Sequence, residues 1–152
     1  MNDELKKQLE FEEGFRSKVY LCPAGKRTIG FGHNLDAQPW FRGSDIPDEI
    51  SLEFARELLN YDLLRARRGL FREWALAMLL SQPRMDACIN MVFQLGIAGF
   101  MEFRKLRKAL AAGDWQKAHD EALNSAWAKQ TPGRAKRVAW QLLHDQYYEI
   151  PS

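Results

Sequence analysis

The chain has 152 residues, of which 46% are hydrophobic and 28% charged, and its formal net charge is +2. A domain of this length buries roughly 70% of the surface that its unfolded chain exposes, so a hydrophobic core can form. The composition excludes a disordered or collagen-like chain. The longest apolar run covers seven residues, 74–80, whereas a bilayer-spanning helix needs about 20. We therefore expect one domain that does not insert stably into a membrane.

Charge is distributed unevenly along the chain. Residues 1–60 hold 8 Lys or Arg against 11 Asp or Glu, and residues 61–152 hold 14 against 9. A mildly basic second half suits an anionic polymer as a partner. No DNA- or RNA-binding motif accompanies these charges, so we expect no nucleic-acid partner.

Cysteine and histidine are too few and too scattered for a metal site or a disulfide framework. The cysteines are Cys22 and Cys88, and the histidines, His33, His119 and His144, do not lie at metal-ligand spacings. Cys88 stands in an apolar segment typical of a buried helix stripe. We therefore expect no metal site. Because Cys88 is placed in the helical part of the chain, away from the hairpin with Cys22, we also expect no disulfide bond between the two.

In chain order, the first predicted element is a short helix that begins near Asp3 and carries Leu5 and Leu9. Residues 15–32 then place strand-forming side chains around a Pro-Ala-Gly turn, which predicts a small β-hairpin. The segment 34–50 is rich in Pro, Gly, Asp and Ser and predicts an irregular connection.

A long helix is predicted next, because Ser51 can cap a run of apolar residues at helical spacing. The remainder predicts further helices interrupted at glycines such as Gly69. Thr131 as a cap, followed by Pro132 at the first helical position, predicts a last helix that ends near residue 144. These patterns indicate a mainly helical α+β domain with two lobes around a cleft. The predicted parts are a hairpin lobe at about 13–50, a connecting helix at about 52–68 and a helical lobe at about 70–152.

Three side chains in the first part of the chain form a plausible catalytic set. Glu13 stands where the first helix should end, Cys22 comes next in the hairpin turn, and Thr28 lies on the returning strand. A helix end and a hairpin can present a carboxyl, a thiol and a hydroxyl to one cleft. This set suits cleavage of an acetal, which needs an acid for the leaving oxygen and groups that place water on the other side of the sugar.

At this point the sequence resembles the phage-type lysozymes, glycoside hydrolase family 24. The spacing of Glu13, Cys22 and Thr28 matches the catalytic triad pattern of that family, and the segment 28–33, Thr-Ile-Gly-Phe-Gly-His, matches the family at the end of that pattern. Two later blocks, 89–94 and 130–138, match in the same order. The resemblance extends over nearly the whole chain and implies a lysozyme-like fold.

The resemblance also implies roles for individual residues. Glu13 matches the general acid that protonates the glycosidic oxygen, and Thr28 matches the threonine that holds the attacking water. Arg134 falls where the family places an arginine that pairs with the catalytic glutamate. His33 and Asp62 match a structural pair that ties the hairpin lobe to the long helix.

Saccharide-contact positions are implied in the same way. Phe93 and Gln94 match cleft residues at the meeting of the two lobes. Asn34, Phe103 and Glu121 fall at further contact positions, although none of the three keeps the residue type of the T-even members of the family.

Cys22 is the main departure. T-even members of the family carry an aspartate at this position, whereas some phage endolysins carry cysteine. A thiolate can act as a base or as a nucleophile when its pKa is lowered from the free value of about 8.5. Otherwise the thiol only fills space while Glu13 and Thr28 share the work. Whether the product is inverted or retained therefore stays open at this stage.

The resemblance implies a bacteriolytic muramidase that needs no cofactor. Its substrate would be the β-1,4 bond between N-acetylmuramic acid and N-acetylglucosamine in bacterial peptidoglycan. We expect a monomer that waits in the host cytoplasm, without a signal peptide, until a holin opens the membrane. Two alternatives remain: a lysozyme-like protein that binds peptidoglycan without cutting it, and a lytic transglycosylase that forms an anhydro sugar.

Overall fold

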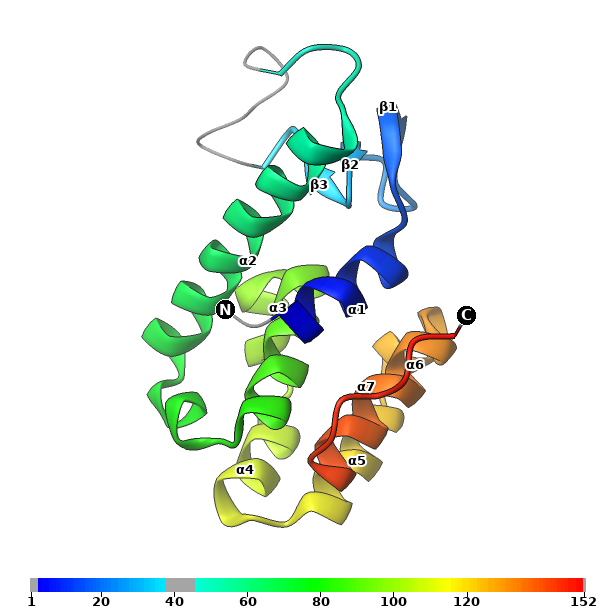
Figure 1. Cartoon of the computed structure of the whole chain (residues 1–152). Coiled ribbons are helices and arrows are strands. Elements are labelled where there is room, and N and C mark those ends of the chain that lie inside the picture. The colour runs from blue at the N-terminus through cyan, green and yellow to red at the C-terminus, as the bar shows by residue number, and fades with distance from the viewer. Residues whose placement is uncertain (1–2, 38–45, 152) are drawn as a thin grey trace. The chain divides into compact units, whose positions relative to one another are not determined.

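The computed structural model describes residues 3–37 and 46–151, and its chain divides into two compact units. The N-terminal unit comprises residues 1–64 and the helical unit residues 65–152. The architecture is mainly helical, with one small antiparallel sheet near the N-terminus (Figure 1). This confirms the predicted α+β class.

The N-terminal unit begins with a helix and continues into the sheet. Helix α1 spans Asp3–Glu13, and the strands are β1 (Arg16–Leu21), β2 (Arg27–Gly30) and β3 (His33–Asn34), in the order β1-β2-β3. Tyr20 pairs with Thr28 and Leu21 with Arg27 across the hairpin. The predicted hairpin is therefore confirmed. The third strand has two residues, which is too short for an alternating pattern to reveal it.

The segment that leads into the next helix is fastened to the hairpin. The Ile50 amide donates to the Ser17 carbonyl over 2.9 Å. The backbones of Lys18 and Glu49 form an isolated antiparallel β-bridge. Gly30 has a φ of +69°, and a Cβ added there would lie 3.2 Å from the Cβ of Ala55. Glycine is thus required where β2 passes the start of the following helix.

Helix α2 spans Leu52–Glu73 and carries the chain from one unit into the other. The Ser51 hydroxyl accepts a hydrogen bond from the Phe54 amide over 3.1 Å, so the predicted cap is confirmed. The helix ends five residues later than the predicted 68. Gly69 does not interrupt it: the helix continues through this glycine, which packs near Ile97.

The helical unit holds the remaining elements. Gly96, with a φ of +76°, interrupts the helical backbone within α3 (Gln82–Met101). Pro132 opens the last helix as predicted. Thr131 precedes it, but its side chain makes no capping hydrogen bond, because the hydroxyl donates to the Trp127 carbonyl instead. The elements are η1 (Ala75–Leu79), α3 (Gln82–Met101), α4 (Arg104–Ala112), α5 (Trp115–Leu123), α6 (Ala126–Gln130) and α7 (Pro132–His144).

Each unit has its own set of buried apolar side chains. None of the helices within 3–37 and 46–151 has the length and apolar character that crossing a membrane requires. Fully buried side chains of the N-terminal unit include Leu5, Leu9, Ile29, Leu59 and Leu63, and those of the helical unit include Ile89, Met91, Phe100, Leu106, Leu110 and Leu142.

Candidate active site

Glu13 is the last residue of α1, and the backbone around it is shaped by two glycines. Gly14, with a φ of +68°, ends the helix, and its amide donates to the Glu10 carbonyl over 3.0 Å. Gly32, with a φ of +73°, lies directly against the carboxyl group. A Cβ added at Gly32 would be 2.5 Å from Oε1 of Glu13. The turn between β2 and β3 therefore forms one wall around the carboxyl and leaves no room for a side chain there.

Cys22 occupies the hairpin turn between β1 and β2. Its amide donates to the Lys26 carbonyl over 3.0 Å, and its carbonyl accepts from the Gly25 amide over 2.8 Å. This tight turn directs backbone amides at the sulfur. Hydrogen bonds to the sulfur, first from the Lys26 backbone and then from the Ala24 backbone and the Thr28 hydroxyl, lower the pKa of the half-buried Cys22 thiol. The surroundings thus favour a thiolate.

Thr28 is buried on β2, beside the cysteine. Its hydroxyl donates to the Lys26 carbonyl over 2.9 Å and also interacts with the Cys22 sulfur. Tyr20 faces Thr28 across the hairpin. Burial, and after it the charge of Glu13, raises the pKa of Tyr20. The carboxyl of Glu13 is therefore close enough to the hairpin for its charge to affect Tyr20. All three predicted catalytic residues lie in the N-terminal unit.

A buried hydrogen-bonded contact between a histidine and an aspartate supports this arrangement. Nδ1 of His33 on β3 lies 2.7 Å from Oδ2 of Asp62 on α2, and both side chains are almost inaccessible to solvent. The side-chain oxygen of Asn34, which is predicted to contact saccharide, accepts a hydrogen bond from the Asp36 amide over 2.8 Å. The neighbouring turn is held in addition by the exposed pair of Arg27 and Asp36.

The helical unit groups a second set of predicted residues. Phe93 and Gln94 lie on α3, and Oε1 of Gln94 accepts from the indole N–H of Trp127 over 2.8 Å. Phe103 packs edge-on against the same indole at a centroid distance of 6.0 Å. Trp127 therefore brings Gln94 and Phe103 together.

Arg134 and Glu121 also lie in the helical unit. Arg134 on α7 is buried, and its Nε donates to the side-chain oxygen of Asn90 over 3.0 Å. The Asn90 amide in turn faces the Tyr148 hydroxyl at 3.4 Å. Glu121 is half-buried on α5. Arg134 is thus fixed by polar neighbours within its own unit.

The phage lysozyme family model matches residues 10–142, which include most of both units. The chain belongs to this family. Family membership makes it a lysozyme-type glycoside hydrolase and agrees with the resemblance carried by the three sequence blocks.

Several curated proteins are similar over most of this phage lysozyme chain. The pre-baseplate central spike protein Gp5 of Enterobacteria phage T4 is 32% identical, covering 93% of this chain but only 28% of the spike protein. Probable T4-type lysozyme 2 of Dictyostelium discoideum is 30% identical, covering 91% of this chain and 92% of the relative. An endolysin of Acyrthosiphon pisum secondary endosymbiont phage 1 is 31% identical, covering 82% and 83%.

The sequence does not predict the part that two residues of this chain, Gly32 and Trp127, play beside the candidate site residues. Gly32 belongs to a Gly-Phe-Gly run that is no phosphate loop, and its contact with Glu13 depends on a fold that the run does not reveal. A glycine in a predicted turn indicates a residue with a positive φ. It does not indicate that the Glu13 carboxyl lies against that residue. Trp127 has no sequence signal that separates it from an ordinary core tryptophan.

Proposed function

We propose that the chain is a muramidase that hydrolyses the β-1,4 bond between N-acetylmuramic acid and N-acetylglucosamine in bacterial peptidoglycan. Family membership supports the reaction class. The single observation that carries the assignment of residues is the position of Glu13, whose carboxyl lies against the turn at Gly32 in the same unit as Cys22 and Thr28. Glycoside hydrolysis requires an acid that protonates the leaving oxygen, and a second group that activates water or attacks the anomeric carbon.

Glu13 acts as the general acid in this proposal. Its carboxylic acid gives a proton to the glycosidic oxygen as the bond to the anomeric carbon breaks. Cys22 and Thr28 assist attack from the other side, the hydroxyl by holding the water. The lowered pKa of Cys22 supports a thiolate that either accepts the proton of the water or attacks the anomeric carbon itself. The anomer formed first distinguishes the two routes. Attack by an activated water inverts the anomeric carbon in one displacement, whereas attack by sulfur forms a glycosyl-enzyme that water then hydrolyses, and the two displacements together retain the configuration.

The other predicted residues bind saccharide or support the site. Phe93, Gln94 and Phe103 provide an aromatic and amide surface organised by Trp127, which suits a sugar ring and its hydroxyls. Arg134 takes the part of the family arginine that pairs with the catalytic glutamate, here Glu13. Asn34 and Glu121 contribute further saccharide contacts, and the pair of His33 and Asp62 holds β3 to α2. A holin releases the enzyme from the host cytoplasm to the wall.

The release of reducing ends from purified peptidoglycan tests this proposal. Glu13→Gln removes the proton donor at nearly constant volume and is expected to lower the rate by about a thousandfold. Glu12→Gln, the neighbouring carboxylate on the same helix, is the matched control and keeps activity near that of the parent. A folded parent that sediments with the wall but releases no sugar contradicts hydrolysis and favours the binding protein. Anhydro sugars in the soluble products, seen by mass spectrometry, favour a transglycosylase.

A further inference from the structure

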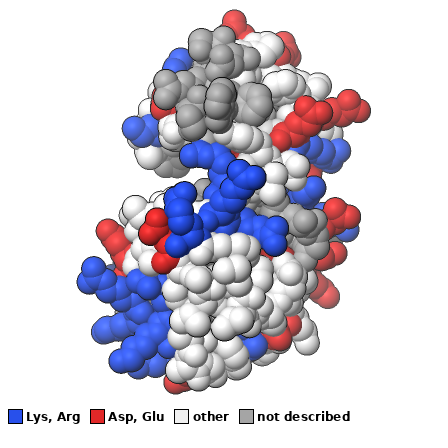
Figure 2. Space-filling view, turned by 90° about the vertical axis from the view of Figure 1, so that its left-hand side faces the viewer, with Lys and Arg blue, Asp and Glu red and all other residues white. Residues whose placement is uncertain are grey.

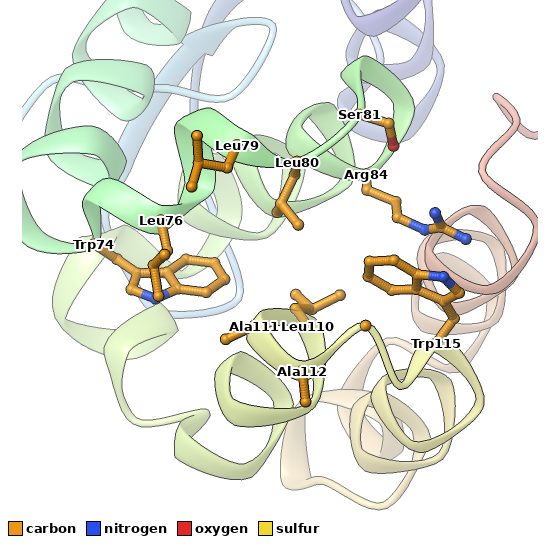
Figure 3. Close-up of a pocket in the computed structure, with 11 residues that line it drawn as sticks. Trp74, Leu76, Leu79, Leu80, Ser81, Arg84, Leu110, Ala111, Ala112 and Trp115 are labelled. Carbon is orange, nitrogen blue, oxygen red and sulfur yellow. The ribbon is translucent and has the colours of Figure 1, made fainter.

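The helical unit contains a hollow far along the chain from the hairpin residues. Its cavity volume is about 450 Å³, and its walls come from η1, the end of α4 and the start of α5. Trp74, Leu76, Leu79, Leu80, Leu110 and Trp115 supply most of the apolar lining (Figure 3). Arg84 closes one side, with its guanidinium 3.7 Å from the centre of the Trp115 ring. No residue proposed for glycoside hydrolysis lines this hollow.

The short helix η1 exposes large apolar side chains at the mouth of the hollow. Leu76, Met78 and Leu79 are 47%, 53% and 81% exposed, all within five residues. Leu76 and Leu79 also line the hollow. Single exposed apolar side chains are ordinary, but a group beside a preformed apolar hollow marks a binding surface.

Basic side chains lead to the same rim. Helix α4 holds four Lys or Arg among nine residues and no Asp or Glu. Arg104, Lys108 and Ala112 lie four residues apart and so share one helix face, and Ala112 lines the hollow. Residues 65–113 as a whole hold nine Lys or Arg against three Asp or Glu. Figure 2 shows Lys and Arg side chains gathered beside an area without charged side chains.

The acidic residues next to the hollow are already engaged. Glu73 lies 3.3 Å from the Arg72 guanidinium, and Asp114 accepts from the Lys117 amide as the cap of α5. Arg84 donates to the carbonyls of Leu142 and Leu143, and its guanidinium lies 3.5 Å from the Asp145 carboxylate, which also accepts from the Ser81 hydroxyl. The charge left to face a partner is therefore positive and comes mainly from α4.

We propose that this face of the helical unit docks on an anionic phospholipid bilayer. Leu76, Met78 and Leu79 enter the acyl region, the hollow takes up part of a lipid chain, and the α4 cations lie at the headgroups. Protruding leucines favour a bilayer over a peptide, since a fluid acyl layer accommodates them without a matching groove. Anionic headgroups match the cations, each of which contributes to attraction near such a surface. Docking adds a surface association and involves no membrane-spanning helix.

Co-sedimentation with vesicles tests the proposal. The parent is expected to sediment with vesicles of equal parts phosphatidylglycerol and phosphatidylcholine and to stay in solution with phosphatidylcholine alone. Leu76→Ser/Leu79→Ser is expected to lower the partition coefficient about tenfold or more, because two exposed leucines no longer enter the acyl layer. Arg104→Gln/Lys108→Gln is expected to lower it about tenfold. Leu21→Ser, which changes a leucine 69% exposed on β1, is the matched control and binds as the parent does.

Each other outcome overturns the proposal. It is wrong if the parent binds neither vesicle, or if the leucine pair can be replaced without loss. Self-association of the parent that the leucine variant abolishes, seen by sedimentation velocity, would mean that a second copy covers this face. Circular dichroism verifies that the surface variants are folded. Vesicle binding requires no hydrolysis, so Glu13→Gln is expected to bind like the parent, and failure here is distinguishable from failure of the proposed muramidase activity.

Discussion

The two cysteines of this phage lysozyme mark two regions with different physical demands. Cys22 lies half-buried in a hairpin turn, where backbone amides and the Thr28 hydroxyl lower the pKa of its thiol. Cys88 lies fully buried on α3, where burial, and after it the charge of Asp86, raises the pKa of its thiol to about 12. The same side chain is a candidate reagent in one place and a small apolar core group in the other.

The difference arises from how each backbone is built. Glycines with positive φ shape the turns beside the proposed catalytic residues, at Gly14, Gly25 and Gly32. Helix α3 instead buries an unbroken run of side chains from Arg84 to Val92. Tight turns direct amides toward a ligand or a side chain, whereas a buried helix has already paired its amides. The hairpin turn therefore suits a reactive thiol, and the buried face of α3 suits an inert one.

Thiol labelling gives the largest expected contrast between the two regions. With a disulfide reagent such as Ellman's, one thiol of the native protein is expected to react rapidly and the second only after unfolding. Cys88 reacts through opening of the core, which slows it at least about a thousandfold. Because its pKa is lowered, Cys22 is expected to reach half its maximal rate at a pH below that of a free cysteine, about 8.5.

The control for this labelling is Cys22→Ser, which removes the rapid phase and leaves only the thiol released by denaturant. Rapid labelling of two thiols at native conditions would contradict the buried position of Cys88. A labelling rate that reaches half its maximum at the pH expected of a free cysteine would contradict hydrogen bonding to the Cys22 sulfur.

How much of the site could be predicted depended on the range of the interactions. The hairpin, the Ser51 cap and the spacing of Glu13, Cys22 and Thr28 are local patterns that the sequence displays. Thr131 shows where local patterns stop being sufficient. Its hydroxyl could bond to the start of α7 or to the preceding helical turn, and in the structure it bonds to the preceding turn. The contacts of Gly32 with Glu13 and of Trp127 with Gln94 join residues 19 and 33 positions apart, and no local signal predicts such neighbours.

Glycine substitutions sharpen the comparison next. Gly32→Ala places a Cβ 2.5 Å from the Glu13 carboxyl and must displace it. Displacement of a catalytic group by about 1 Å costs about a hundredfold in rate, so we expect kcat to fall by about that factor while KM changes little. Gly25→Ala is the matched control, since its φ of +78° imposes similar backbone strain but nothing lies within 4 Å of the added Cβ.

Steady-state rates on soluble peptidoglycan fragments and thermal melts together separate displacement from strain. Both variants are expected to lose similar stability, because L side chains disfavour positive φ. Equal losses of activity in the two variants would assign the effect to strain alone and remove Gly32 from the positioning of Glu13.

Two side-chain contacts in the N-terminal unit, His33 with Asp62 and Arg27 with Asp36, give the smallest expected contrast, which is in stability. Asp62→Asn leaves His33 buried beside a neutral amide and is expected to cost about 1–3 kcal/mol, which for a chain of this length lowers the Tm by about 2–4 °C per kcal/mol. Asp36→Asn breaks an exposed pair with Arg27 and is expected to shift the Tm much less. Hydrogen bonds from the Arg27 side chain lower the pKa of Asp36. Its small contribution is thus present above the unfolded-state pKa of about 3.9 and is lost as the pH falls through the lower folded-state value. Equal shifts in the two variants at pH 7 would mean that solvent reaches His33 as freely as Arg27, and the buried link between β3 and α2 would have to be abandoned.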